Sequence, residues 1–200
     1  MTIRAVIFDI GGVLVRTQDL EPRRKWEKRF GLPEWGLAEL VFNCPASRRA
    51  SVGQATRHEV WAEVARQLSL TPAELEELKV DFWKGDVWDT DLLAFIRSLR
   101  PRFQTGIISN AWPDAREAVK AHVNGEAFDV ILFSGEEGVE KPDPEIYRRA
   151  LARLNVAPAE AVFVDDMLPN VEAARALGMG EVHFQPGVEL RMALGKLGIA

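Results

Sequence analysis

Three aspartates follow hydrophobic runs along this chain of 200 residues, and they are the first candidates for chemistry. Asp9 follows residues 5–8, and the adjacent pair Asp165 and Asp166 follows residues 161–164. Taken alone, Asp9 is equally typical of a carboxylate that satisfies a turn at the end of a strand. Three carboxylates that share a site repel one another unless a cation lies among them, and hard oxygen ligands suit Mg²⁺. If the fold brings these side chains together, the sequence predicts a Mg²⁺ site.

Polar groups that bind phosphate follow two other hydrophobic runs. One run ends in Ser109 and Asn110, and Lys141 lies in the loop after residues 129–133. A hydroxyl, an ammonium group and a metal ion would hold a phosphoryl group where the Asp9 carboxylate can attack phosphorus in line. These residues therefore predict phosphoryl transfer if they meet at one point.

The hydrophobic runs predict strands that place these residues at one edge of a sheet. The expected strands are residues 5–8, 103–109, 129–133, 161–164 and, more weakly, 181–184. Helical patterns over residues 92–99 and 146–154 alternate with them, because apolar side chains recur there at three- and four-residue spacing. This alternation predicts an α/β fold with a doubly wound parallel sheet, in which the carboxyl ends of the strands form the ligand-binding edge.

Residues 16–89 contain no convincing strand and are too long for a simple connection. Four helices are expected there, over residues 23–30 and 34–43, around the apolar stripe at 60–68, and after a capping box at 71–74. We therefore expect a core domain formed by residues 1–15 and 90–200. Residues 16–89 are expected to form a helical cap that lies over the ligand-binding edge.

Composition and charge narrow the class of partner and the compartment. The net charge of −5 and the pI near 5.4 disfavour a surface for nucleic acid or anionic membrane, which concentrates basic residues in a patch. No hydrophobic run approaches the roughly 20 residues of a membrane-spanning helix. The lone Cys44 excludes an internal disulfide framework and fits a reducing compartment. We expect a cytoplasmic protein that is a monomer or a homodimer.

Four short motifs in order give the whole chain a family resemblance. They are FDIGGVL at 8–14, IISN at 107–110, KPDP at 141–144 and FVDDMLPN at 163–170. Together they resemble the motifs of haloacid dehalogenase (HAD) superfamily hydrolases that carry an α-helical cap after the first strand. Within the superfamily, the chain is most similar to small phosphatases related to the N-terminal domain of soluble epoxide hydrolases. The resemblance implies a Rossmann-like core and a phosphatase that acts on a small phosphorylated metabolite.

The resemblance also implies roles for individual residues. Asp9 would be the nucleophile that forms an aspartyl-phosphate, and Lys141 would neutralise charge on Asp9 and on the phosphoryl group. The phosphoryl oxygens would be bound by Lys141 together with Gly11, Gly12, Ser109 and the Asn110 backbone.

The metal ligands implied by the resemblance come from two of the motifs. Asp9 and the Gly11 carbonyl would bind Mg²⁺ from the first motif, and Asp166 would bind it directly from the last. Asp165 would bind through water or accept hydrogen bonds behind the metal, and Asn170 would hold the metal loop by hydrogen bonding.

Gly11 is the departure from the family pattern, because most of these phosphatases carry a second aspartate two residues after the nucleophile. That residue is a general acid and base, whose help is typically worth about 10²- to 10⁴-fold in rate. A cap residue such as His58 or a metal-bound water would have to replace it, or the protein turns over slowly or only binds phosphate esters. A metal-independent 2-haloacid dehalogenase, which also lacks the second aspartate, is the alternative enzyme, although the paired Asp165 and Asp166 favour a metal.

The six tryptophans gather mainly in the expected cap. Helical spacing predicts that Trp26, Trp35, Trp61 and Trp83 form chiefly its core, although one of them is a candidate to line the substrate pocket. Trp112, which comes shortly after Ser109, is expected to pack within its own loop.

Overall fold

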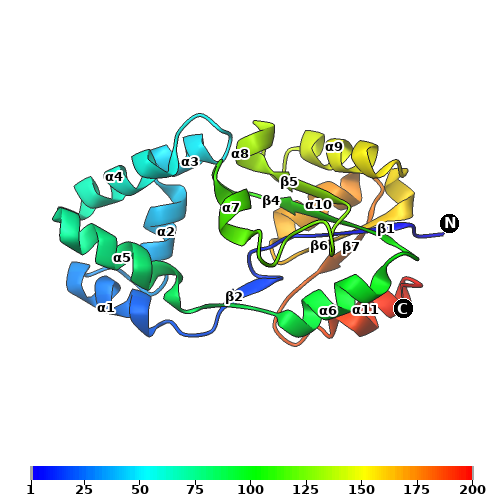
Figure 1. Cartoon of the computed structure of the whole chain (residues 1–200), viewed down its shortest axis with the longest axis horizontal. Helices are drawn as coiled ribbons and strands as arrows, with labels where there is room; N and C mark the ends of the chain where they lie inside the picture. Colours follow the sequence, from blue (N-terminus) through cyan, green and yellow to red (C-terminus); the bar gives the residue numbers. More distant parts are fainter. Residues whose placement is uncertain (1, 200) are drawn as a thin grey trace.

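A computed structural model describes residues 2–199 and shows two lobes joined by a narrow waist (Figure 1). The sheet lobe contains five strands, which are β1 (Ala5–Phe8), β4 (Gln104–Ser109), β5 (Val130–Phe133), β6 (Ala161–Asp165) and β7 (Gly180–His183). They form one sheet in the order β5-β4-β1-β6-β7, and all neighbours are parallel. The five expected strands are therefore confirmed.

Strand β1 lies at the centre of the sheet, and its sequence explains why. All four of its residues are completely buried, as expected for a strand covered on both faces. Val6 and Phe8 belong to one hydrophobic cluster, whereas Ala5 and Ile7 belong to another. Successive side chains of a strand point to opposite faces, so this alternation shows two helical layers with the sheet between them.

The two layers consist of helices that follow the strands in the chain. The helices of the sheet lobe are α6 (Thr90–Leu99), α7 (Ala115–Val119), α8 (Ser134–Glu137), α9 (Pro144–Leu154), α10 (Leu168–Ala176) and α11 (Leu190–Lys196), with a 3₁₀ turn at Pro158–Glu160. Helices α6 and α11 cover one face, and α9 and α10 cover the other (Figure 1). The expected doubly wound parallel α/β sheet is thus confirmed.

The helical lobe consists of α1 (Glu21–Phe30), α2 (Gly36–Asn43), α3 (Pro45–Ala50), α4 (Arg57–Leu68) and α5 (Pro72–Lys84). Capping boxes begin both α4 and α5, at Thr56 and Thr71. The four expected helices are present, and a fifth helix, α3, begins at Pro45. A core that includes Trp26, Val60 and Phe82 holds the helices together.

The expectation that residues 16–89 contain no strand is wrong. β2 (Val15–Thr17) and β3 (Asp86–Trp88) pair as an antiparallel ribbon where the chain enters and leaves the helical lobe. Buried Arg23 strengthens this junction, because its guanidinium donates to both Asp86 oxygens at 2.9 Å. Each strand has only three residues, which is too few to show the alternating pattern that predicts a strand. Each is a strand only because it pairs with the other, which lies about 70 residues away in the sequence.

None of the helices in the described part of the chain is long and apolar enough to cross a membrane.

Candidate active site

Parallel pairing brings the carboxyl ends of three strands to one edge of the sheet. Phe8 pairs with Ile107 of β4 on one side and with Val164 of β6 on the other. The residues that follow these positions therefore come together, and the Asp9 backbone N–H donates to the Val164 carbonyl at 2.9 Å. Asp9, Ser109 and Asp165, which are far apart in the sequence, thus share one edge.

Lys141 lies between two of the carboxylates. Its Nζ is 2.8 Å from Asp9 Oδ1 and 2.7 Å from Asp165 Oδ2, and its side chain is only 1% exposed. Asp9 Oδ1 also accepts a hydrogen bond from the Ile10 backbone N–H at 2.7 Å. The second oxygen of Asp9, Oδ2, accepts no hydrogen bond from the residues that the structure describes. It is therefore the oxygen of Asp9 that can attack a substrate or bind a metal.

Asp165 and Asp166 are adjacent in the sequence but have different surroundings. Asp165 is completely buried, and beyond Lys141 it accepts hydrogen bonds from the Met167 N–H at 2.8 Å and the Asn170 amide at 3.1 Å. Both of its oxygens are thus already engaged. Asp166 is less buried, and its carboxylate lies against the Gly12 backbone.

The neighbours of these acids change their pKa values. Burial raises the pKa of Asp9 to about 6; Asp165 acts in the same direction, and Lys141 opposes both. Burial and the charge on Asp165 also raise the pKa of Asp166. Burial works against the charged form of Lys141, but the carboxylates of Asp9 and Asp165 outweigh it and raise the pKa of the ammonium group. The lysine is therefore a fixed positive charge, and the acids compete for it.

This donor set fits a divalent cation. Asp9, Asp165 and Asp166 each offer a carboxylate oxygen, and these oxygens lie within 4.8 Å of one another. Three carboxylates face one ammonium group, so the buried cluster carries two uncompensated negative charges when all are ionised. Such an excess is costly in a buried site unless a cation balances it.

The two glycines after Asp9 differ in what they permit. A Cβ atom at Gly12 would lie 2.2 Å from Asp166 Oδ2, and the backbone there has φ +72°, so a larger residue would displace the carboxylate. A Cβ atom at Gly11 would meet nothing within 4 Å. The loop therefore requires glycine at position 12, whereas position 11 has room for a side chain.

Asn110 contacts Lys141 through its side chain, whereas the sequence suggested a role for its backbone. Its Nδ2 donates to the Lys141 carbonyl and its Oδ1 accepts from the Lys141 N–H, both at 2.8 Å. This pair of hydrogen bonds fixes the backbone from which the lysine side chain starts. Ser109 precedes it as the buried last residue of β4.

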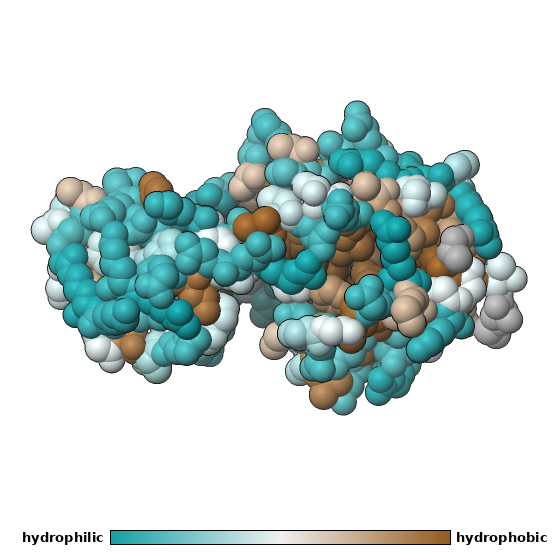
Figure 2. All heavy atoms as spheres, turned by 90° about the horizontal axis from the view of Figure 1, so that it is seen from below, coloured by the Kyte–Doolittle hydropathy of each residue, from teal (hydrophilic) through white to brown (hydrophobic). Residues whose placement is uncertain are grey.

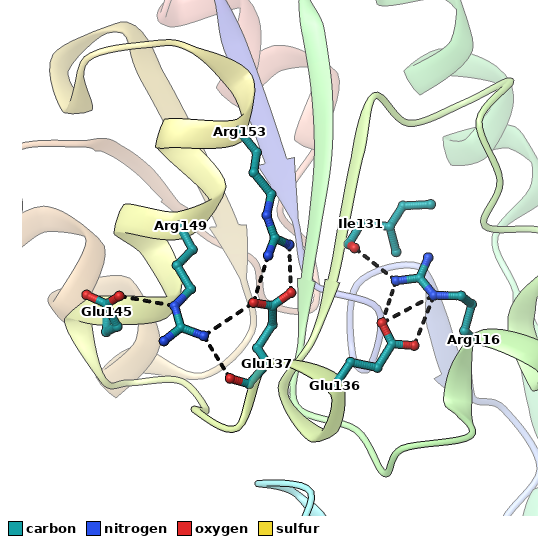
Figure 3. A network of polar contacts seen from close by, with 7 residues as sticks. All are labelled: Arg116, Ile131, Glu136, Glu137, Glu145, Arg149 and Arg153. Atoms are coloured by element: carbon teal, nitrogen blue, oxygen red, sulfur yellow. Dashed lines mark hydrogen bonds and ion pairs between the residues drawn. The ribbon is translucent and has the colours of Figure 1, made fainter.

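A cluster of ion pairs holds the segment that leads to Lys141 (Figure 3). Arg153 donates to both oxygens of Glu137 at 2.6 and 2.9 Å, and Arg149 donates to the Glu137 carbonyl at 2.7 Å. These contacts tie the end of α8 to α9. Arg116 binds Glu136 and the Ile131 carbonyl on the other side of α8 (Figure 3). The loop between α8 and α9, which carries Lys141, is thus anchored at its start.

Three residues that the sequence analysis did not single out support the site. The Ser134 hydroxyl accepts from the Ala111 N–H at 2.9 Å and donates to the Ala111 carbonyl at 3.2 Å. Tyr147 donates its hydroxyl to the Asn170 carbonyl at 3.0 Å, and His183 contacts the Asp166 carbonyl at 2.9 Å. Their only sequence signal is a position at or near the end of a strand or in a helix beside one. His58 is exposed on α4 and makes none of the hydrogen bonds or ion pairs of this cluster.

Trp112 connects the two lobes rather than packing within its own loop. It is 93% buried among the core residues of the helical lobe, and its indole N–H donates to the Ser47 hydroxyl of α3 at 3.0 Å. Arg57 of α4 adds an ion pair with Asp114 at 2.8 Å. The loop that follows Ser109 is therefore attached to the helical lobe.

Comparisons with known proteins match nearly the whole chain. The family described as haloacid dehalogenase-like hydrolase matches residues 3–178. The chain is 27% identical to sesquiterpene phosphatase astK of Aspergillus oryzae, over 98% of this chain and 97% of that protein. It is also 27% identical to bifunctional epoxide hydrolase 2 of Sus scrofa, over 91% of this chain but only 36% of that protein.

Solved structures share the fold. A HAD family enzyme of Bacteroides thetaiotaomicron, solved with magnesium and inorganic phosphate, superimposes with a TM-score of 0.78 at 20% identity, over 96% of this chain and 98% of that one. The L-2-haloacid dehalogenase of Xanthobacter autotrophicus superimposes with a TM-score of 0.66 at 22% identity, over 100% of this chain and 85% of that one.

Proposed function

We propose that this chain, which belongs to the haloacid dehalogenase-like hydrolase family, is a Mg²⁺-dependent phosphatase that hydrolyses a phosphomonoester through an aspartyl-phosphate on Asp9. The observation that carries the proposal is the unpaired Asp9 Oδ2 beside a buried lysine and two further carboxylates. A relative that matches end to end is named a phosphatase. Residues 1–15 and 90–200 are proposed as the catalytic core and residues 16–89 as its cap.

In this proposal, Asp9 attacks phosphorus as the ester P–O bond breaks, and the departing alkoxide takes a proton from water. A second water then attacks the phosphorus of the acyl phosphate, which releases inorganic phosphate and restores the Asp9 carboxylate. Lys141 and the Ile10 N–H bind Oδ1 of Asp9, which leaves Oδ2 to face both the substrate and the metal. Lys141 and Ser109 would bind phosphoryl oxygens together with backbone N–H groups after Asp9, and Asn110 would hold Lys141 in place.

Mg²⁺ would be held by Asp9, Asp166 and the Gly11 carbonyl, with Asp165 behind them. When bound, it supplies positive charge that stabilises the phosphoryl oxygens in the transition state. The full engagement of both Asp165 oxygens supports a role behind the metal rather than on it. A fold relative was solved with magnesium and inorganic phosphate, which supports Mg²⁺ as the cation.

The test is a panel of phosphomonoesters assayed with Mg²⁺ and with a chelator. We expect hydrolysis that requires Mg²⁺ and that falls by at least about 10³-fold in Asp9→Asn, because the neutral amide cannot act as the nucleophile. Asp91→Asn, an exposed substitution in the first turn of α6, is the matched control and should leave the rate unchanged. Full activity of Asp9→Asn would refute the nucleophile assignment.

A metal-independent haloacid dehalogenase is the second candidate, favoured by the absence of a carboxylate at Gly11. Release of chloride from 2-chloropropionate in the presence of chelator, without phosphatase activity, would establish it. Gly11→Asp separates the two further, because the open space at that position accepts a side chain. A phosphatase that lacks its general acid should gain about 10²-fold in rate from this substitution, whereas a dehalogenase should not.

A further inference from the structure

The face of α2 that the helical lobe leaves uncovered is aromatic. Leu37 and Val41 are fully buried against the other helices, whereas Trp35 and Phe42 are 47% and 45% exposed. Trp35 precedes the first residue of α2 and Phe42 lies near its end, and both rings line the same hollow. Figure 1 shows α2 on the side of the helical lobe that is nearer to the sheet lobe. The burial of Trp26 and Trp61 confirms the expectation that they form the core of the helical lobe. The exposure of Trp35 and Trp83 shows that this expectation is wrong for these two residues.

A hollow of about 410 Å³ lies along this face. Trp35, Ala38 and Phe42 supply apolar walls, and the charged side chains among its described lining residues are the carboxylates of Glu34 and Glu39. No lysine or arginine is among these lining residues. Glu34 is paired with Arg24 at 3.2 Å, so Glu39 is the lining carboxylate that would repel a second anionic group on a ligand.

Aromatic side chains connect the hollow with the candidate active site. The Phe42 ring is 6.2 Å from the Trp112 ring and 5.9 Å from that of Trp83, which is 41% exposed. Trp112 is three residues beyond Ser109, a span of at most about 11 Å. The exposed rings of the helical lobe therefore begin close to the residues proposed to hold phosphate.

The sheet lobe also presents apolar surface next to the carboxylates. Met167 and Leu168 follow Asp166 directly and are 54% and 46% exposed. Figure 2 shows hydrophobic atoms on the flanks of both lobes beside the waist. A molecule whose phosphoryl group lies near Asp9 thus has apolar surface available from both lobes.

We propose that the enzyme takes phosphomonoesters of an uncharged, apolar alcohol, whose carbon skeleton packs against Trp35, Phe42 and Trp83. The inference rests on the proposed phosphatase function and extends it to the leaving group. Trp35, the residue before α2, has a left-handed backbone with φ 66°. This conformation is uncommon and energetically unfavourable for a bulky residue. The fold accepts it at a position where the ring is 47% exposed, and burial of the ring therefore does not account for it.

The first test measures kcat/KM for ethyl, butyl and hexyl phosphate, with phosphoserine and phosphocholine as charged comparisons. Each buried methylene should raise kcat/KM by about fourfold. We expect hexyl phosphate to exceed ethyl phosphate by at least tenfold and phosphoserine to fall below ethyl phosphate. Phe42→Ser should reduce the value for hexyl phosphate at least tenfold more than it reduces the value for ethyl phosphate. Met192→Ser, which replaces an apolar side chain 64% exposed on α11, is the matched control.

A second measurement keeps this inference separate from the proposed function. Calorimetric titration of the Asp9→Asn protein with the same alkyl phosphates, in Mg²⁺, needs no turnover. A Kd that falls with chain length supports the inference, and a Kd independent of chain length overturns it. Hydrolysis of none of the esters would instead contradict the proposed phosphatase function.

Two other results would also overturn the inference. A preference for phosphocholine over hexyl phosphate would show that the aromatic rings and Glu39 bind a cation. If Phe42→Ser converts a dimer into a monomer in light scattering and leaves the chain-length dependence intact, the aromatic face is a contact between copies of the chain.

Discussion

The two lobes hold their candidate functional side chains in opposite ways. In the sheet lobe, Lys141 is buried between Asp9 and Asp165, and the polar centre is held by hydrogen bonds from several elements. In the helical lobe, Trp35 and Phe42 lie half-exposed along a hollow. The sheet lobe therefore presents a fixed geometry, which suits the group common to all substrates of such an enzyme. The helical lobe presents exposed apolar surface, which suits the part of a substrate that varies.

Trp112 lies where these two kinds of surface meet. It follows the Ser109 and Asn110 segment of the sheet lobe, but its ring is 6.1 Å from Trp61 in the core of the helical lobe. Through Asn110, the same segment fixes the Lys141 backbone. A shift of the helical lobe would therefore move the segment that positions Lys141. Substitutions in the polar centre and at the junction between the lobes test the two regions separately.

The largest effect is expected from Lys141→Met, which removes the ammonium group that the two carboxylates share. We expect the free energy of unfolding, measured in urea without Mg²⁺, to fall by about 3–5 kcal/mol, because Asp9 and Asp165 lose their buried counter-charge. Lys120→Met, whose side chain is 67% exposed, should change it by less than about 0.5 kcal/mol. Equal effects of the two substitutions would contradict a fixed polar centre.

The next effect tests the junction between the lobes. Trp112→Ala should lower the free energy of unfolding by about 3 kcal/mol, because it removes a large ring from a closely packed aromatic cluster. Trp35→Ala removes a ring of the same size from an exposed position and should cost less than about 1 kcal/mol. Urea unfolding measures both, and a larger loss for Trp35→Ala would show that the exposed ring is structural.

A smaller effect is expected from the hydrogen bond at that junction. Ser47→Ala leaves the Trp112 indole N–H buried without its acceptor and should cost about 1–2 kcal/mol in thermal or urea unfolding. Ser51→Ala serves as the control, because that exposed hydroxyl donates to the Arg48 carbonyl of its own turn. If Ser47→Ala proves neutral, water reaches the indole and the junction is looser than the structure indicates.

The smallest effect concerns Glu74, a partly exposed capping residue of the helical lobe. Hydrogen bonds from Arg29 and Thr71 lower the pKa of Glu74 from 4.5 to about 2. Because the folded state favours the charged carboxylate, Glu74 stabilises the lobe above pH 4.5, and this contribution is lost as the pH falls toward 2. Glu74→Gln should therefore lower the unfolding midpoint at pH 6 but differ little from the wild type near pH 2. A constant difference across this range would show that packing, not charge, is involved.

Part of the fold was readable because it depends on local patterns. The buried run at residues 5–8, the capping box at Thr71 and the apolar stripe of α9 each predicted their element, and the structure confirms them. The four motifs likewise indicated the family that the comparisons identify. The ribbon β2 and β3 could not be read in this way, because neither strand has a pattern without its distant partner.

The candidate site likewise contains residues that local sequence patterns predict and contacts that depend on the tertiary structure. Residue types and their positions at strand ends were sufficient to select Asp9, Lys141, Asp165 and Asp166 as one cluster, since parallel strands must end together. They could not show that Asn110 binds Lys141 through its side chain, or that Ser134 and Tyr147 support the loops. Each of these contacts joins segments more than 20 residues apart and depends on side-chain direction.

By itself, the sequence determined the family, the parallel sheet and the acids at its edge, because strand patterns and turn residues act locally. Only the tertiary structure decided which tryptophans are buried. Trp26 and Trp35 both lie in the helical lobe, yet one is 1% exposed and the other 47%. The spacing of apolar residues predicts which face of a helix they share. The packing of neighbouring helices decides whether that face is buried. The open face of α2 and the insertion of Trp112 between the lobes follow from that packing.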